Sequence, residues 1–169
     1  MIDQNPATGR GASNQRRTFR RWLKITSKRT FVVYPICIVA IEMAIHRGDP
    51  IIIPWGAVLL LWGYLQYRLV GGYRERLGGG GPGLDVPPER ILDVGPYRYV
   101  RNPMYLGHLI FMAGLAITFQ SLTAVALLLF HIVWFQRRVL EDEKSLQERF
   151  GDAYTAYKAR VKRWIPFVI

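Results

Sequence analysis

Two polar clusters, separated by a long apolar stretch, contain the groups in this chain best suited to bind a ligand. The first is Gly95–Gly107 (GPYRYVRNPMYLG), which carries Arg98 and Arg101 close to where the apolar stretch begins. The second is Arg137–Glu143, which follows that stretch and combines two arginines with three acidic residues. A guanidinium binds a carboxylate through its planar fork, and a carboxylate accepts hydrogen bonds from ammonium and hydroxyl groups. Together the clusters suit a ligand with a charged head and an apolar body.

The spacing within each cluster predicts which side chains share a helix face. A helix that begins near Pro103 would present Tyr105 and His108 on one face, three residues apart. Arg138 and Asp142 are four residues apart, so a helix points them the same way. A solvated, charged helix end is the simpler interpretation of the second cluster, and the spacing alone leaves both open.

The histidines, the cysteine and one isolated acid narrow the possible chemistry. His108 and His131 lie in the apolar stretch, but spacing places no third ligand near them, so no metal site is predicted. Cys37 is the only cysteine, which excludes an intrachain disulfide and a cysteine-based metal cluster. Glu42 interrupts an apolar segment and is either a functional group or a side chain that reaches water.

Composition and charge placement favour a membrane protein over a nucleic-acid-binding one. The chain has 169 residues, which is typical of a single domain, and 50% of them are hydrophobic. The net charge is +11, but the basic residues flank apolar runs instead of forming a separate module. Anionic lipid headgroups are therefore the expected partner, and nucleic acid is not.

The apolar runs predict an all-α, polytopic membrane protein with about four transmembrane helices. Thr30–His46 and Ile51–Val70 are two spans near the usual length of about 20 residues. Met104–Gln136 is too long for one span and just long enough for two short ones, with the best turn at Thr118–Thr123. Eight basic residues precede the first span, five lie between the second and the third, and eight follow the fourth. By the positive-inside rule, both termini and the central loop are cytoplasmic, in a location such as the bacterial inner membrane.

The segments outside the spans have simpler predicted roles. Arg16–Lys28 interleaves basic and apolar side chains, which predicts an interfacial helix on the cytosolic leaflet, with a solvated tail as the alternative. Gly78–Gly83 lacks the Lys-Ser/Thr of a phosphate-binding loop, so we interpret it as a flexible link. The fourth span is expected to continue as a helix that ends at Gly151, and Asp152 is expected to cap a further helix. The predicted organisation is a basic tail with an interfacial helix (1–29), a transmembrane hairpin (30–72), a Gly-rich cytosolic loop (73–94) and a core with the second hairpin and the C-terminal helices (95–169).

Motifs in the C-terminal part of the chain resemble those of one family of integral membrane enzymes. They are Gly95–Gly107, then Arg138-x3-Asp142-Glu143 followed by Leu146, Phe150, Gly151, Tyr154 and Tyr157, and finally Arg163-x2-Pro166. This series is similar to the isoprenylcysteine carboxyl methyltransferase and phospholipid methyltransferase superfamily. The resemblance covers about Gly95–Pro166 and implies S-adenosylmethionine as cofactor, held in a cytosol-facing pocket.

The resemblance also implies roles for individual residues. Catalytic roles are implied for Arg101, Arg138 and Glu143. The residues implied in cofactor binding are Tyr97, Arg98, Asn102, Pro103, Tyr105, His108, Asp142 and Glu143. Asn102 stands where many members have histidine, and it cannot act as an acid or a base. Asp142 replaces the first glutamate of the family's usual pair, which keeps the carboxylate.

Three functions are open at this point. The leading hypothesis is a membrane methyltransferase that acts on a lipophilic acceptor, such as an isoprenylcysteine-type carboxylate. The second is N-methylation of a phospholipid amine headgroup. The third is a non-catalytic membrane module that binds lipid. The sequence chooses neither the acceptor atom nor the oligomeric state.

Overall fold

A computed structural model describes residues 25–79, 84 and 88–165, and over these ranges the chain is mainly helical. The elements are α2 (Thr26–Lys28), a π-helical turn η1 (Arg29–Val33), α3 (Tyr34–Ile45), α4 (Gly56–Gly78), a 3-10 turn η2 (Gly95–Arg98), α5 (Pro103–Phe119), α6 (Leu122–Phe150) and α7 (Asp152–Arg160). Within the described ranges there is no strand, only an isolated bridge between Val100 and Lys162. The predicted all-α class is therefore confirmed for this part of the chain.

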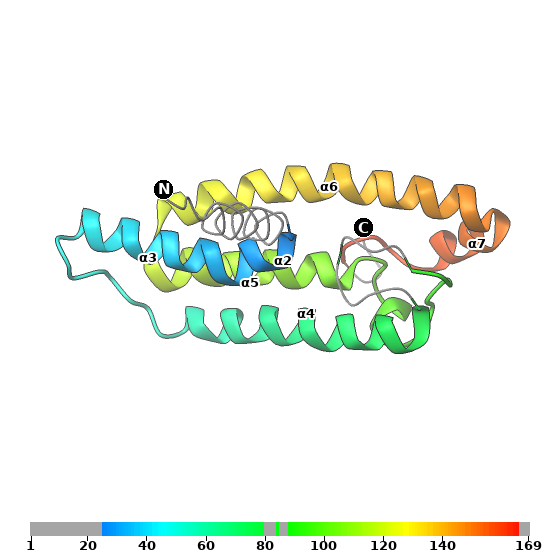
Figure 1. Ribbon diagram of the computed structural model, residues 1–169, viewed down its shortest axis with the longest axis horizontal. Helices are drawn as coiled ribbons and strands as arrows, with labels where there is room; N and C mark the ends of the chain where they lie inside the picture. The colour runs from blue at the N-terminus through cyan, green and yellow to red at the C-terminus, as the bar shows by residue number, and fades with distance from the viewer. Residues whose placement is uncertain (1–24, 80–83, 85–87, 166–169) are drawn as a thin grey trace, which may run out of the picture.

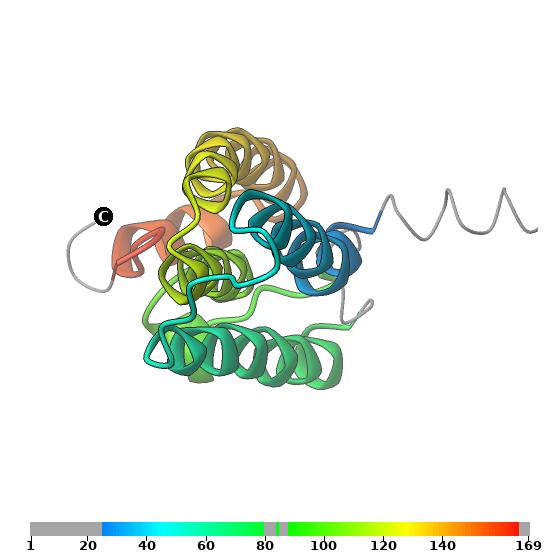
Figure 2. The same cartoon turned by 90° about the vertical axis from the view of Figure 1, so that its left-hand side faces the viewer.

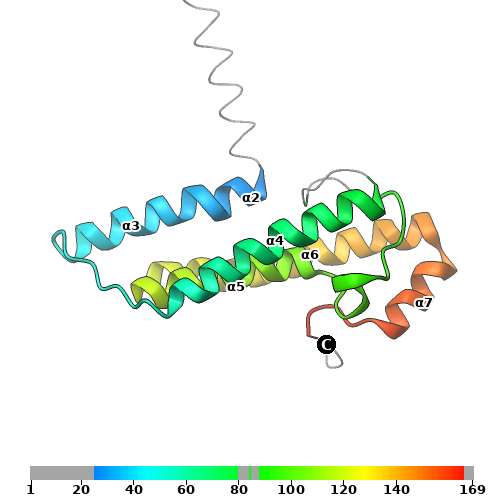
Figure 3. The same ribbon diagram turned by 90° about the horizontal axis from the view of Figure 1, so that it is seen from below.

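The long helices run alongside one another with alternating chain direction (Figure 1). Helix α5 is central, because it packs against α3, α4 and α6. An end-on view shows the α2–α3 segment, α4 and α6 arranged around it (Figure 2). The connection from α4 to α5 and the chain after α6 consequently lie at the same end of the bundle, where α7 is also found (Figure 3).

Glycines bring α4 and α5 unusually close together. A Cβ atom added at Gly63 would lie 2.5 Å from the backbone nitrogen of Phe111, and one added at Gly107 would lie 2.9 Å from the carbonyl oxygen of Gly63. Both distances are shorter than van der Waals contact, so only glycine permits this approach. The two helices therefore meet backbone to backbone, which fixes where α5 begins relative to the end of α4.

The first helical segment contains an irregularity that Pro35 explains. Pro35 has no backbone N–H to donate to the carbonyl of Phe31, and its ring crowds that carbonyl. The turn before it widens into a π-helix, in which the backbone N–H of Tyr34 donates to the carbonyl of Arg29. Phe31 lies within this widened turn and packs against the rings of Tyr64, Tyr67, His108 and Phe111.

Helix α4 begins and ends later than the predicted span Ile51–Val70. Residues 51–53 are not helical, and the backbone N–H of Ile53 instead donates to the carbonyl of Thr118 at 2.7 Å. At its other end α4 continues to Gly78, into the segment predicted as a loop. The continuation is stabilised by burial of one face, which includes the side chain of Arg74.

One prediction near the N-terminus falls mostly outside the described residues, and one at the start of α7 is corrected. Most of the predicted interfacial helix Arg16–Lys28 lies outside the described residues, but Thr26 begins α2 and is buried at 1% exposure inside the bundle. The described part of that segment therefore belongs to the first bundle helix. Asp152 does not cap α7, because Gly151 occupies the cap position and Asp152 lies in the first turn, where its charge still favours the helix N-terminus.

The predicted boundaries of α5 and α6 are confirmed. The turn predicted at Thr118–Thr123 is formed by Gln120, which has a left-handed backbone (φ +46°), and Ser121. The Ser121 hydroxyl caps α6 by accepting the backbone N–H of Ala124 at 3.1 Å. Helix α6 ends at Phe150, and Gly151 follows with φ +54°, a conformation that glycine adopts without strain.

One helix in the described part of the chain, α6, is long and apolar enough to cross a membrane by length and composition. Helix α5 is apolar but shorter. Helix α3 has 12 residues, and α4 carries Gln66, Arg68 and the charged run Arg74–Arg76. The four predicted crossings are thus not established by the helices themselves and stay a prediction.

Candidate functional site

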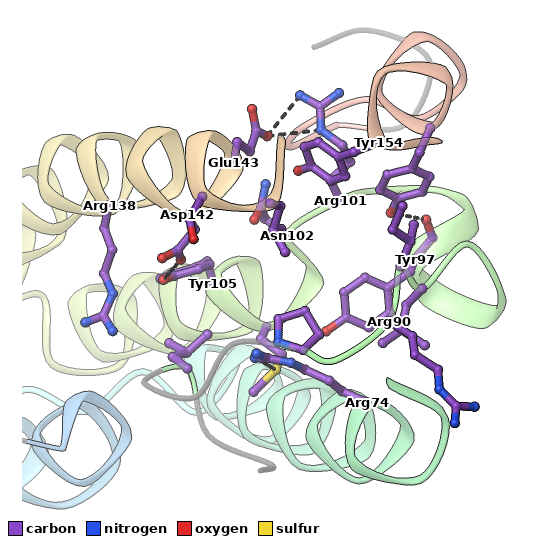
Figure 4. A pocket seen from close by; sticks show the side chains of 18 residues that line it. Arg74, Arg90, Tyr97, Arg101, Asn102, Tyr105, Arg138, Asp142, Glu143 and Tyr154 are labelled. Atoms are coloured by element: carbon purple, nitrogen blue, oxygen red, sulfur yellow. Dashed lines mark hydrogen bonds and ion pairs between the residues drawn. The ribbon is translucent and has the colours of Figure 1, made fainter. Parts of the chain in front are cut away.

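A cavity of about 260 Å³ lies at the end of the bundle where η2 and α7 gather (Figure 4). Side chains from α4, from the segment before η2, from the start of α5, from α6 and from α7 line it. The polar and aromatic lining residues are Arg74, Arg90, Tyr97, Arg101, Asn102, Tyr105, Arg138, Asp142, Glu143, Ser145, Tyr154 and Tyr157. The structure therefore brings the two polar clusters of the sequence together at one cavity.

The backbone at the start of α5 directs the side chains of the first cluster. Pro103 occupies the first helical position, where its missing N–H costs nothing. The preceding residue, Asn102, is outside the helical region, and its carbonyl accepts the backbone N–H of Leu106 at 3.1 Å. Asn102 and Tyr105 both line the cavity as a result of this sharp helix start.

Helix α6 presents the second cluster through its periodicity. Phe135, Val139 and Glu143 recur every four residues and are buried. Arg138 and Asp142 lie on the adjacent stripe and line the cavity. The hydroxyl of Tyr105 donates a hydrogen bond of 2.7 Å to Asp142, so α5 and α6 are linked directly at the site.

Glu143 is held between two arginines. Its Oε1 accepts hydrogen bonds from Arg101 Nε at 3.0 Å and from Arg163 Nε at 3.1 Å, and its Oε2 accepts one from Arg163 Nη2 at 2.8 Å. Arg101 Nη1 also donates to the backbone carbonyls of Lys158 and Val161, at 3.1 and 2.8 Å. The geometry thus gives Arg101 and Glu143 contacts within the protein, where the resemblance implied contacts with ligand.

The pKa values of the two neighbouring carboxyl groups are shifted in opposite directions. Burial raises the pKa of Asp142, although the Tyr105 hydrogen bond and the charge of Arg138 oppose this. Burial also acts to raise the pKa of Glu143, but hydrogen bonds and charges from Arg163 and Arg101 outweigh it and lower that pKa below its ordinary value. Burial raises the pKa of Tyr97 to about 12, so its hydroxyl stays protonated at neutral pH.

Arg138 lies at the side of the cavity nearest to the first helix. Its guanidinium carbon is 5.8 Å from the ring centre of Trp134, and its Nη1 donates to the hydroxyl of Thr26 at 3.4 Å. The guanidinium of Arg29 lies 5.3 Å from the same tryptophan ring. Trp134 is therefore contacted by two arginines, and it does not line the cavity.

Three predicted cofactor-binding residues also lie away from the cavity. Arg98 lines a separate surface depression. Pro103 is buried at the start of α5, where its carbonyl accepts a hydrogen bond of 2.9 Å from Gln66 Nε2. His108 is fully buried, with its Nδ1 3.0 Å from the carbonyl of Met104. Motif position assigned these residues to the site, but it carries no information about side-chain direction.

Other polar groups in the apolar segments have partners inside the bundle. His131 Nε2 on α6 lies 3.1 Å from the hydroxyl of Tyr34 on α3, so this pair links two helices. Glu42 is 4% exposed and lies 3.5 Å from His46. Neither His131 nor Glu42 lines the cavity.

Sequence reasoning missed several residues of the cavity. Arg74 comes from α4, is 7% exposed and has its Nη1 3.7 Å from the sulfur of Met104. Arg74 follows the apolar Val70 by four residues, so on a continuous helix the two side chains share one face. The second span was predicted to end at Val70, and this relation was therefore not recognised. Tyr154 and Tyr157 line the cavity from α7, and they had been quoted in the motif without a role.

Comparison with known proteins finds similarity in the part of the chain that contains both polar clusters. Residues 81–153, which include both polar clusters, match the phospholipid methyltransferase family. The chain is 35% identical over 77 residues to protein-S-isoprenylcysteine O-methyltransferase of Schizosaccharomyces pombe, over 44% of this chain and 32% of the relative. It is 36% identical over 86 residues to methanethiol S-methyltransferase 1 of Bradyrhizobium diazoefficiens, over 50% and 29%. It is 31% identical over 80 residues to a probable protein-S-isoprenylcysteine O-methyltransferase of Oryza sativa subsp. indica, over 47% and 42%.

The fold, the cavity and the sequence similarity agree on the type of protein. It is an all-helical protein whose arginine-rich and tyrosine-rich cavity lies largely within the matched stretch. The matched stretch is similar to the phospholipid methyltransferase family and to isoprenylcysteine O-methyltransferases, which supports the superfamily that the motifs predicted. The chain's alignments span 29–42% of the length of these three relatives.

Proposed function

We propose that the protein is an integral membrane methyltransferase that uses S-adenosylmethionine to methylate a lipophilic acceptor at the cytosolic membrane face. The observation that carries this proposal is the meeting of Arg138, Asp142 and Tyr105 in one cavity, within the stretch that matches a methyltransferase family. These groups come from two helices, and sequence similarity alone does not show that they lie close together.

The side chains of the cavity fit the charged groups of S-adenosylmethionine. That molecule has a carboxylate, an ammonium and a sulfonium, and when bound it supplies an electrophilic methyl group. The guanidinium of Arg138 suits the carboxylate, and the carboxylate of Asp142 suits the ammonium. The ring faces of Tyr97 and Tyr154 suit a sulfonium, at about 0.5–2 kcal/mol for a cation over an aromatic ring.

Positioning is the main task left to the protein. An acceptor carboxylate is already nucleophilic and needs no base, which agrees with Asn102 at a position where many relatives have histidine. Holding two reactants in the right geometry contributes up to roughly 7–11 kcal/mol. The Tyr105–Asp142 hydrogen bond and the Arg101–Glu143 pair fix the walls against which a ligand would be held.

The charges of the cavity favour an anionic acceptor, such as an isoprenylcysteine-type carboxylate. Four arginines line the cavity against two carboxylates, and one of the two, Glu143, is already engaged by arginines. A phospholipid amine is the second candidate, because the carboxylate of Asp142 faces the cavity and would attract an ammonium.

The outer surface of the bundle supports a location in the bilayer. Large apolar side chains are exposed along several helices, including Ile36, Leu61, Trp62, Leu69, Leu122, Leu129 and Phe130, and Trp55 is exposed just before α4. Water-soluble monomers rarely expose contiguous apolar surfaces of this kind. Basic residues gather at the cavity end, as expected where anionic headgroups meet a cytosolic face. We therefore propose that the four helical segments cross the bilayer.

Transfer of radiolabelled methyl groups tests the proposal. Purified protein in lipid nanodiscs is incubated with tritiated S-adenosylmethionine and a farnesylated cysteine derivative that has a free carboxylate. We expect label in the lipid fraction that mild base releases as methanol, because esters hydrolyse. Label that survives base would indicate N-methylation of a phospholipid instead. No label in any lipid, together with no binding of S-adenosylhomocysteine, would leave the non-catalytic module as the better account.

A further inference from the structure

The chain after α7 is tied to the rest of the site by polar contacts. We call residues 161–164 the C-terminal strap. The backbone N–H of Arg101 donates to the carbonyl of Lys162 at 2.8 Å, next to the bridge between Val100 and Lys162. The indole N–H of Trp164 donates to Gln136 on α6 at 2.7 Å. The strap is thus joined both to the start of α5 and to α6.

Arg163 makes the strap's charged contact with α6. Its Nε and Nη2 donate to the two oxygens of Glu143 at 3.1 and 2.8 Å, which is the forked arrangement that makes guanidinium–carboxylate pairs strong. The Arg163 side chain is 27% exposed and that of Glu143 is 9% exposed. Through the same carboxylate, Arg163 is coupled to Arg101, which holds the carbonyls of Lys158 and Val161 at the end of α7.

These contacts hold in place the part of the cavity that is lined by the two tyrosines of α7. Tyr154 and Tyr157 line the cavity from α7, and the hydroxyl of Tyr157 donates to the carbonyl of Tyr97 at 2.8 Å. Helix α7 has nine residues, and it is held at its C-terminal end by the side chain of Arg101. Movement of the strap would therefore move two residues that shape the cavity.

We infer that Arg163 is a positioning residue of the cavity: paired with Glu143, it latches the strap and holds the α7 tyrosines in place. Arg163 lies beyond residues 81–153, which match the family model, and it belongs to the last motif of the resemblance, for which no role was predicted. The inference rests on the proposed function for the identity of the ligand, whereas the latch itself is testable without any ligand.

A nearby arginine provides a matched control. Arg160 also lies close to the strap and pairs with a carboxylate, that of Asp93, at 3.6 Å. That pair is 67% and 50% exposed, however, and exposed pairs contribute little to stability. The variants Arg163→Gln and Arg160→Gln therefore remove the same charge from neighbouring positions with different surroundings.

The test uses two readouts on the full chain in nanodiscs. Hydrogen–deuterium exchange follows peptides that cover residues 99–103 and 158–165, and calorimetry follows the affinity for S-adenosylhomocysteine. In Arg163→Gln we expect faster exchange in both peptides and an affinity lower by on the order of 10-fold, which corresponds to the loss of about 1.4 kcal/mol of contacts with the displaced tyrosines. Arg163→Lys should restore part of both losses, and Arg160→Gln should match the parent. Adding Arg163→Gln to Glu143→Gln should produce no further change.

Two results would overturn the inference. One is parent-like exchange and affinity in Arg163→Gln. The other is a loss that adds fully to that of Glu143→Gln, which would mean that Arg163 acts independently of Glu143. If Arg163→Gln is not recovered folded, exchange and affinity are measured in Arg163→Lys instead. A lysine ammonium cannot make both hydrogen bonds of the guanidinium to Glu143, so a smaller loss in both measurements is expected. If the parent itself fails to bind S-adenosylhomocysteine, the proposed function fails, while the exchange data still decide the latch.

Discussion

Replacing Glu143 by glutamine should destabilise the protein by about 3 kcal/mol, the lower end of the range for breaking a buried ion pair. The substitution keeps the shape of the side chain but removes the charge that two guanidinium groups contact at 2.8–3.1 Å. Arg101 is 10% exposed and loses its counter-charge in a dry setting, whereas Arg163 is 27% exposed and is partly stabilised by water. The partial exposure of Arg163 is why we place the cost at the lower end.

Thermal unfolding of the purified protein measures this cost. For a chain of this size each kcal/mol shifts Tm by about 2–4 °C, so Glu143→Gln should melt about 6–12 °C below the parent. The control is Glu148→Gln on the same helix, since Glu148 is 69% exposed and reaches Lys144 only at 4.0 Å. The control should melt with the parent. If both variants melt within about 2 °C of the parent, the pair adds no stability and the reasoning is wrong.

The pH dependence of this difference follows from the lowered pKa of Glu143. A carboxyl group with a lowered folded-state pKa stabilises the fold fully above its unfolded value, here 4.5, and loses that contribution as the pH falls through the folded-state pKa. The Tm gap between the parent and Glu143→Gln should therefore be constant from pH 8 to about pH 5 and shrink below about pH 4.5. A gap that widens in acid would contradict the assignment.

Three further predictions concern other parts of the molecule. Tyr105→Phe should lower the free energy of unfolding by about 1.5–3 kcal/mol, because it removes a hydrogen bond to a carboxylate. Asp142→Asn should cost less stability in the Tyr105→Phe background than in the parent, and additive melting shifts would refute the pairing. Gly63→Leu should prevent close packing of α4 against α5 and abolish the monodisperse peak in gel filtration, whereas Gly72→Ala, with nothing within 4 Å of the added Cβ, should elute like the parent. A monodisperse Gly63→Leu would show that the helices do not need that approach. Cys37 is exposed on α3, so in intact vesicles a permeant maleimide should label it and a charged, impermeant one should not; equal labelling would refute its place in the bilayer.

The convergence of the two polar clusters was predictable because it depends on chain direction alone. Basic residues on both sides of an apolar hairpin predicted that the first cluster and the end of α6 share one side. Structure and sequence agree here, with Arg101 and Glu143 3.0 Å apart. The boundaries of α5 and α6 were also predictable, since Pro103 and Gly151 give strong local signals.

Side-chain partners were less predictable, because they depend on tertiary contacts. Arg98 and Arg101 are three residues apart in one motif, but a 3-10 turn ends between them and only Arg101 lines the cavity. Glu143 was expected to meet a ligand, and nothing local indicates that Arg163, which is 20 residues later, donates to it. Arg74 was missed because charged residues were taken to end the second span, although the helix continues past them.

Calorimetric titration of the parent chain in nanodiscs with S-adenosylhomocysteine tests the central claim most directly. We expect saturable heat with one site per chain, an affinity that Arg138→Gln weakens, and an unchanged affinity in Arg137→Gln, whose side chain is exposed and does not line the cavity. No saturable heat from a folded parent, or equal binding by the Arg138→Gln chain, would contradict the assignment of this cavity.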